Sequence, residues 1–229
     1  MSPPIEDHPV LVREVVRRDG SRGLALRVFC SRRRESVPLE TCEACPSCVE
    51  VAPDVDGTSA LVRCSPPRDD ATTPPTDDPQ AGDDLREDCT PVGAILRGAT
   101  LCIACRTEVR ELRALMVEGG LPGVFVVDEG GRLAGLVRER DLVIAPRLTP
   151  NAGRAAPEAG VVRLVGAVMS TATSVEEFAS VCSALRRMAG AHLREVPVIT
   201  RDGQLVGVLR DIEGLRWIAD QRRGERSGP

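Results

Sequence analysis

The sequence predicts an α+β protein built on two copies of one unit, with a small β-rich segment and an acidic linker before them. Residues 124–141 read VFVVDEGGRLAGLVRERD, and residues 196–213 read VPVITRDGQLVGVLRDIE. Each copy has an apolar run, a Gly turn, a second apolar run with a fixed Gly, and an Arg followed three residues later by an acid. An internal repeat of this kind sets the architecture of the whole chain.

Length and composition favour a soluble protein with one or two domains. The chain has 229 residues, of which 42% are hydrophobic. No run approaches the roughly 18 apolar residues that span a bilayer, so we expect no membrane contact. The N-terminus lacks the pattern of a signal peptide, and we therefore expect a cytoplasmic protein. The net charge of -4 does not favour a general nucleic-acid binder.

Residues 1–64 are predicted to form a small β-rich module. Residues 10–16 and 24–29 have the patterns of strands, and Asp19-Gly20 between them is a turn signal. A further strand, residues 60–63, leads into Cys64, just as the second strand leads into Cys30.

Five cysteines in this module predict a metal site. Cys42-x2-Cys45 can present two sulfurs to one zinc ion, and the strand ends can add Cys30 and Cys64, with Cys48 as a substitute. Because the sequence has no export signal, we expect these cysteines to be metal ligands or reduced thiols rather than disulfides. Cysteines that bind no metal, an iron–sulfur cluster and thiol redox chemistry remain alternatives. The cluster pattern is incomplete, because position 52 is Ala.

Two polar stretches complete the N-terminal part. The run Arg32-Arg33-Arg34 could contact phosphate or an acidic protein surface, but a solvated loop is the simpler interpretation. Contact with nucleic acid is disfavoured, since Phe29 is the only aromatic residue nearby. Residues 65–88 are rich in Pro and Asp and almost devoid of apolar side chains, which predicts a disordered linker.

The two units follow the same order of elements: a helical lead-in, a strand, an amphipathic helix, a hairpin and a closing helix. In the first unit, residues 89–145, these are residues 92–96, 101–104, 108–118, 123–137 and 140 onward. In the second unit, residues 165–220, they are residues 165–169, 172–175, 178–188, 196–209 and 210–220. Residues 146–164 form the connecting loop, and residues 221–229 a flexible tail.

This doubled arrangement resembles a tandem pair of CBS domains, often called a Bateman module, over residues 89–220. The resemblance implies two β-α-β-β-α units that pack through their sheets about a pseudo-twofold axis. It also implies clefts that bind AMP, ADP, ATP or S-adenosylmethionine, and a homodimer of such pairs.

The resemblance places the nucleotide at the end of each repeated stretch. In the family the final acid binds the ribose, which corresponds to Asp141, and a Thr or Ser three residues earlier contacts phosphate. This chain has Arg138 and Arg210 at the hydroxyl position, and Glu213 as the second acid. An Arg can grip a phosphate or pair with the nearby acid, and Glu213 can reach a ribose or only cap the last helix. The candidate nucleotide-binding residues are Asp141, Arg138, Glu213, Arg210, Leu101, Gly123, Gly135 and Gly207.

No nucleophile–base pair, phosphate loop or HExxH motif indicates an enzyme. The sequence favours a sensor whose paired units bind an adenosine-type nucleotide and report its presence to an unidentified protein partner. The alternatives are a dimerisation platform with empty clefts and a nucleic-acid contact through the Arg-rich segment. The apolar face around Trp217 could be core or a dimer contact. Cys102, Cys105 and Cys182 are predicted to be packing residues, and His192 to lie at a helix end or on the surface.

Overall fold

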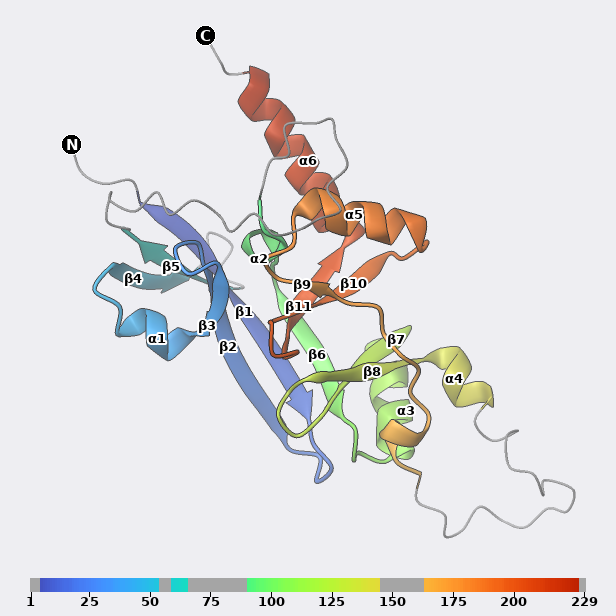
Figure 1. Ribbon diagram of the computed structural model, residues 1–229. Helices are drawn as coiled ribbons and strands as arrows, with labels where there is room; N and C mark the ends of the chain where they lie inside the picture. Colours follow the sequence, from blue (N-terminus) through green and yellow to red (C-terminus); the bar gives the residue numbers. More distant parts are fainter. Residues whose placement is uncertain (1–4, 54–58, 66–89, 145–162, 227–229) are drawn as a thin grey trace, which may run out of the picture.

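The computed structural model describes residues 5–53, 59–65, 90–144 and 163–226 (Figure 1). Most of the predicted linker (residues 66–88) and of the connecting loop (residues 146–162) lies outside the described residues. No helix in the described part is both long and apolar enough to cross a membrane.

The N-terminal part is rich in strands, as predicted. Its elements are β1 (Glu6–Val16), β2 (Arg22–Cys30), β3 (Glu35–Pro38), the short helix α1 (Leu39–Glu43), β4 (Cys48–Pro53) and β5 (Ala60–Cys64). The turn between β1 and β2 contains Gly20, which has φ +74°, a conformation that Gly adopts without steric cost. β1 pairs with β2 along one edge and, through its first residues, with β5.

The first unit has all the predicted elements in the predicted order. They are α2 (Val92–Ile95), β6 (Ala99–Ala104), α3 (Val109–Gly119), β7 (Gly123–Val127), β8 (Leu133–Arg138) and α4 (Glu139–Ile144). α3 packs Val109, Leu112 and Met116 into the core, and it ends at Gly120 in the left-handed conformation.

The second unit repeats this order with two differences. Its elements are the 3₁₀ turn η2 (Val165–Ala167), β9 (Val175–Glu176), α5 (Val181–Gly190), β10 (Glu195–Ile199), β11 (Leu205–Arg210) and α6 (Asp211–Arg226). The strand predicted at residues 172–175 is only two residues long. The predicted flexible tail begins too early, because α6 continues to Arg226.

The prediction of a separate N-terminal module is wrong. β1 pairs in parallel with β6, from Val12 opposite Ala99 to Val16 opposite Ile103, and Figure 1 shows the two strands side by side. The path β3-β2-β1-β6-β7-β8, with β4 and β5 at its side, forms one eight-stranded sheet within the described residues. The described strands before residue 65 therefore extend the sheet of the first unit.

The two units exchange their lead-in segments. Val92 and Leu96 of the first unit are buried in the core of the second, where Val92 N donates to Ala179 O at 2.8 Å. Conversely, Val165 is buried in the core of the first unit, and its N donates to Thr107 O at 2.9 Å. Each unit is therefore completed by a segment of the other.

The hairpin turns of the two units also meet in a reciprocal way, as a pseudo-twofold pair predicts. Leu133 N donates to Gly203 O at 3.0 Å, and Leu205 N donates to Gly131 O at 3.1 Å. Beside this junction a shared core forms from Cys102, Phe125, Val127, Leu136, Leu205 and Val208.

Candidate functional site

A cavity of about 510 Å³ opens between the two units. Its lining comes from the first hairpin, from the segment that precedes β9, and from the stretch between α5 and α6: Pro122, Phe125, Leu136, Arg138, Thr171, Ala172, Thr173, His192, Leu193, Arg194, Glu195, Pro197, Arg210 and Asp211. We call this cavity the inter-unit cleft. Its volume lies in the range of pockets that hold small organic ligands.

Two predicted site residues, Arg138 and Arg210, lie together in this cleft. Each is the last residue of the second hairpin strand in its unit, so the fold brings equivalent positions of the repeat to one place. The Arg138 side chain has no ion pair with any described residue. Arg210 is only loosely paired, with nitrogens 4.0 Å from Glu195 and 3.9 Å from Glu213. Both guanidinium groups can therefore accept a new anionic partner.

Several polar cleft residues were not among the predicted site residues. Thr171 and Thr173 belong to the segment that leaves the first unit at Ser170, whose backbone bonds reciprocally with that of Leu136 at 2.9 Å. Glu195 begins β10, and Asp211 begins α6, where its carboxylate lies 3.5 Å from Arg194. His192 is exposed after the end of α5, as expected, and also lines the cleft. Only the crossing of the two units brings these residues together.

The acids of the repeated stretch, Asp141 and Glu213, do not line the cleft. Asp141 Oδ2 accepts a hydrogen bond from Arg138 N at 2.9 Å, and Glu213 Oε2 accepts one from Arg210 N, also at 2.9 Å. In each unit the acid is the third residue of a helix, and the Arg is its N-cap. This is the acid half of a capping box, which satisfies a backbone donor at the helix start.

The remaining predicted residues of the nucleotide site pack against other parts of the chain. A Cβ on Gly135 would lie 2.6 Å from Ser170 O, and one on Gly207 would lie 3.0 Å from Leu96. Both glycines thus allow the lead-in segments to approach the hairpins. Gly123 faces the backbone of β8, and Leu101 is paired with Glu14 of β1. None of these four lines the cleft.

The predicted zinc site is not supported. Cys30, Cys42, Cys45, Cys48 and Cys64 all have free thiols, and no group of three or more metal-ligating side chains in the described part is arranged to hold a metal ion. The five thiols are nevertheless neighbours. Burial first, and charge on the other four thiols second, raise the pKa of Cys42 to about 11.

Cys102 and Cys105 are packing residues, as predicted, whereas Cys182 is half-buried and belongs to none of the core clusters of the described residues. Cys102 is fully buried in the core shared by the two units, and Cys105 packs against the core of the first unit.

Residues 92–147 and 165–220 both match the family model described as CBS domain. Among curated proteins, the uncharacterised protein YlbB of Bacillus subtilis (strain 168) is 34% identical over 103 residues, or 44% of this chain. The chain spans 64% of the length of that relative.

Three similar solved structures each share 22% sequence identity with this chain. CBSX2 in complex with AMP has a TM-score of 0.46, with 58% of this chain and 98% of that chain covered. The cytosolic domain of the Mg²⁺ channel MgtE in complex with ATP has a TM-score of 0.45, with 58% and 50% covered. A putative acetoin utilization protein (AcuB) from Vibrio cholerae has a TM-score of 0.47, with 61% and 98% covered. These similarities assign no ligand to this chain.

Proposed function

Since residues 92–147 and 165–220 form a tandem pair of CBS domains, we propose that this chain is a regulatory protein whose inter-unit cleft binds an adenosine-type nucleotide. The observation that carries the proposal is the presence of Arg138 and Arg210, one from each CBS domain, in a single cleft of about 510 Å³. A guanidinium binds phosphate through a rigid fork of donors, and two of them suit a polyanion.

The rest of the cleft offers groups for the nucleoside. Phe125, Leu136 and Pro197 give an apolar surface for a base. The hydroxyls of Thr171 and Thr173 and the carboxylate of Glu195 can hydrogen-bond a ribose. We assign the ribose contact to Glu195 rather than to Asp141, because Glu195 lines the cleft and Asp141 does not.

Ligand state is transmitted by a shift between two arrangements of the CBS domains. A ligand held by Arg138 of one domain and Arg210 of the other favours the arrangement in which both guanidiniums reach it. The ligand shifts the population of the chain toward that arrangement, to the extent that it binds this arrangement more tightly than the other. The receiver of this change is a protein partner that contacts the pair.

Thermal unfolding in the presence of AMP, ADP, ATP and S-adenosylmethionine tests the proposal. A ligand at 100 times its dissociation constant should add about 2.7 kcal/mol to the free energy of unfolding. We expect the double variant Arg138→Gln/Arg210→Gln to lose this stabilisation. The control Arg216→Gln changes an exposed side chain of α6 outside the cleft and should keep it. Lack of stabilisation of the native chain by all four ligands would contradict the proposal.

A dimerisation platform is the second candidate. Ile212 and Leu215 on α6 are 44% and 61% exposed, although both are large and apolar. If no nucleotide binds, sedimentation should show a dimer of the native chain that Leu215→Glu converts to a monomer. A native chain that sediments as a monomer excludes this candidate.

A further inference from the structure

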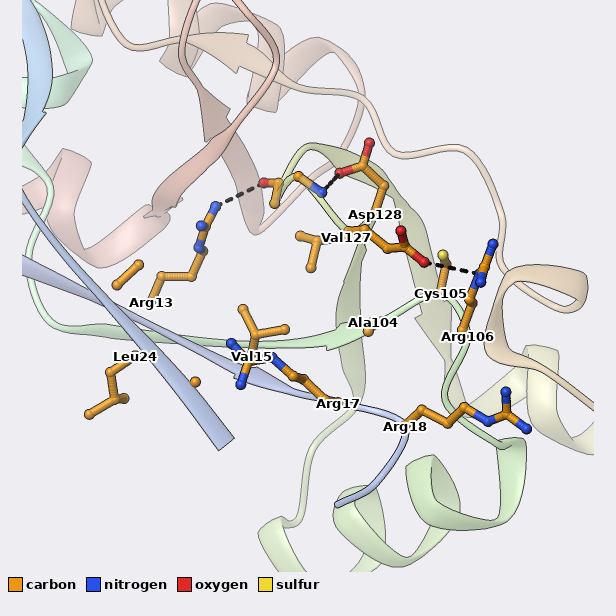
Figure 2. Close-up of a pocket in the computed structure, with 15 residues that line it drawn as sticks. Arg13, Val15, Arg17, Arg18, Leu24, Ala104, Cys105, Arg106, Val127 and Asp128 are labelled. Atoms are coloured by element: carbon orange, nitrogen blue, oxygen red, sulfur yellow. Dashed lines mark hydrogen bonds and ion pairs between the residues drawn. The ribbon is translucent and has the colours of Figure 1, made fainter. Parts of the chain in front are cut away.

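A second cavity, of about 500 Å³, lies outside the inter-unit cleft (Figure 2). It is situated where three neighbouring strands end. β1, β6 and β7 run parallel, and the cavity is lined by the residues that follow each of them: Arg17 and Arg18, Cys105 and Arg106, and residues 128–131. We call it the strand-end cavity. The carboxyl ends of parallel strands are a general location for ligand sites, where the connections leave in different directions.

The strand-end cavity is rich in cations. Arg13, Arg17, Arg18 and Arg106 line it, against two acids. Those acids are already engaged. Asp128 Oδ1 accepts from the backbone N of Gly130 and Arg132 at 2.8 and 2.9 Å, and Glu129 pairs with Arg106 at 3.2 Å.

Three of the four cations have no carboxylate partner among the described residues, and of these only Arg13 is held by backbone carbonyls. Arg17 and Arg18 have no carboxylate of a described residue within 4.0 Å. Both side chains are exposed at the cavity edge, so they can turn toward an anion. The cavity therefore has positive charge that the described part of the chain does not neutralise.

Arg13 forms a fixed wall of the cavity. Its Nη1 donates to Gly131 O at 2.8 Å and to Leu205 O at 2.9 Å, which holds the guanidinium against the turns of both CBS domains. Its Nε is buried without a hydrogen-bond partner. Burial lowers the pKa of Arg13 from its ordinary value.

The space between the charged residues has a small apolar lining. Figure 2 shows Val15, Ala104 and Val127 between Arg13 on one side and Arg106 on the other. On the neighbouring strand β2, the small residues Gly23 and Ala25 leave space in the cavity. A Cβ on Gly23 would lie 2.6 Å from Arg17 Nη2. A ligand that fits this surface combines an anionic group with a compact apolar body.

We propose that the strand-end cavity binds a small phosphate monoester, with its phosphate held by Arg17 and Arg18 and its organic part against Val15, Ala104 and Val127. Seven of the fifteen lining residues lie outside the CBS domains. Arg13 and Leu24 come from the N-terminal strands, and Arg17 and Arg18 from the turn between them, whereas the family match begins at residue 92. The site therefore belongs to the N-terminal extension as much as to the first CBS domain.

Titration calorimetry of the full chain with two probes, butyl phosphate and inorganic phosphate, tests this site. Butyl phosphate should bind at least about tenfold more tightly, because its methylene groups leave water on the apolar lining. The double variant Arg17→Gln/Arg18→Gln should weaken butyl phosphate at least about tenfold, since it removes the two unpaired charges. The matched control is Arg22→Gln, whose side chain pairs with Glu14 at 2.8 Å outside the cavity.

Each variant is also tested with the ligand of the other site, which distinguishes the strand-end cavity from the inter-unit cleft. The Arg17/Arg18 variant should bind AMP as the native chain does, and Arg138→Gln/Arg210→Gln should leave the affinity for butyl phosphate unchanged. Loss of butyl phosphate binding in the Arg138/Arg210 variant would overturn the site. Equal affinity for the two probes, or no binding of either at millimolar concentration, would overturn it as well. The three substituted side chains of the strand-end variant and its control, Arg17, Arg18 and Arg22, are all exposed, and an unchanged melting temperature confirms that the variants fold.

Discussion

At the scale of single residues, the acid of the repeated stretch has a structural role. Asp141 and Glu213 are chemically suited to a ribose, and the sequence predicted that role. In the structure each accepts a hydrogen bond from the backbone of the Arg three residues before it. The spacing of Arg and acid is thus a helix-start pattern as well as a ligand pattern, and the sequence left both interpretations open for Glu213.

Replacing Asp141 by Ala should affect stability and not the ligand. Loss of the cap should lower the free energy of unfolding by about 1 kcal/mol, as measured by urea denaturation. The dissociation constant of the nucleotide should stay within about twofold of the native value, whereas Glu195→Ala should raise it, because a carboxylate acceptor makes a strong hydrogen bond. A large loss of affinity in Asp141→Ala with no loss in Glu195→Ala would return the ribose contact to Asp141.

Cys102 gives a pH-dependent prediction. Burial raises the pKa of its thiol from 9.0 to about 12, so the folded state holds this proton at a pH where the unfolded chain releases it. Stability from this group is complete below pH 9 and is lost as the pH rises from 9 toward 12. Urea denaturation between pH 8 and about 10.5 should show a steeper loss of stability in the native chain than in Cys102→Ala. Parallel curves for the two proteins would contradict the assignment.

At the scale of elements, the sequence predicted the repeat well, because its alternating strands and amphipathic helices are local patterns. It could not predict that Val92 and Val165 are buried in the opposite units. Such an exchange depends on contacts between residues far apart in the chain. The parallel pairing of β1 with β6 was missed for the same reason, since residues 66–89 separate the two parts and carry no pattern that points to their pairing.

Glu177 connects the edge strand β3 to the second CBS domain, and its replacement should reveal the strength of that contact. Its Oε2 accepts from Ser36 N at 2.9 Å in a buried setting, and burial raises its pKa. Glu177→Ala leaves the Ser36 donor without a partner and should cost about 1–3 kcal/mol of stability in urea denaturation. Glu177→Gln keeps an acceptor and should cost less.

The charge of Glu177 should also make the stability difference between the native chain and Glu177→Gln depend on pH. Because its pKa is raised on folding, the native chain is favoured below the unfolded value of 4.5 and loses that contribution as the pH rises through the folded value. The stability of the native chain relative to Glu177→Gln should therefore fall between pH 4 and neutrality. A relative stability that rises with pH would contradict the buried position of this carboxylate.

At the scale of the whole molecule, β1 is the element that joins the parts. Leu11 is buried in the core of the second CBS domain and Val16 in that of the first. Arg13 lies between them and donates to the turns of both domains. The sensor expected from sequence had a separate module on a linker. Here the N-terminal strands contact both CBS domains, so a shift between the domains necessarily moves or strains β1.

Cutting the chain between β5 and α2 tests this integration. With a protease site inserted near residue 75, cleavage should yield two fragments that still elute together in size-exclusion chromatography. Their association rests on five β1–β6 residue pairs, from Val12 to Val16, and on the burial of Leu11 and Val16. Leu11→Asp places a charge in the core of the second domain and should release the fragment, whereas Arg22→Gln on the exposed side of β2 should not. Separate elution of the native fragments would show that the N-terminal strands are held only by the linker.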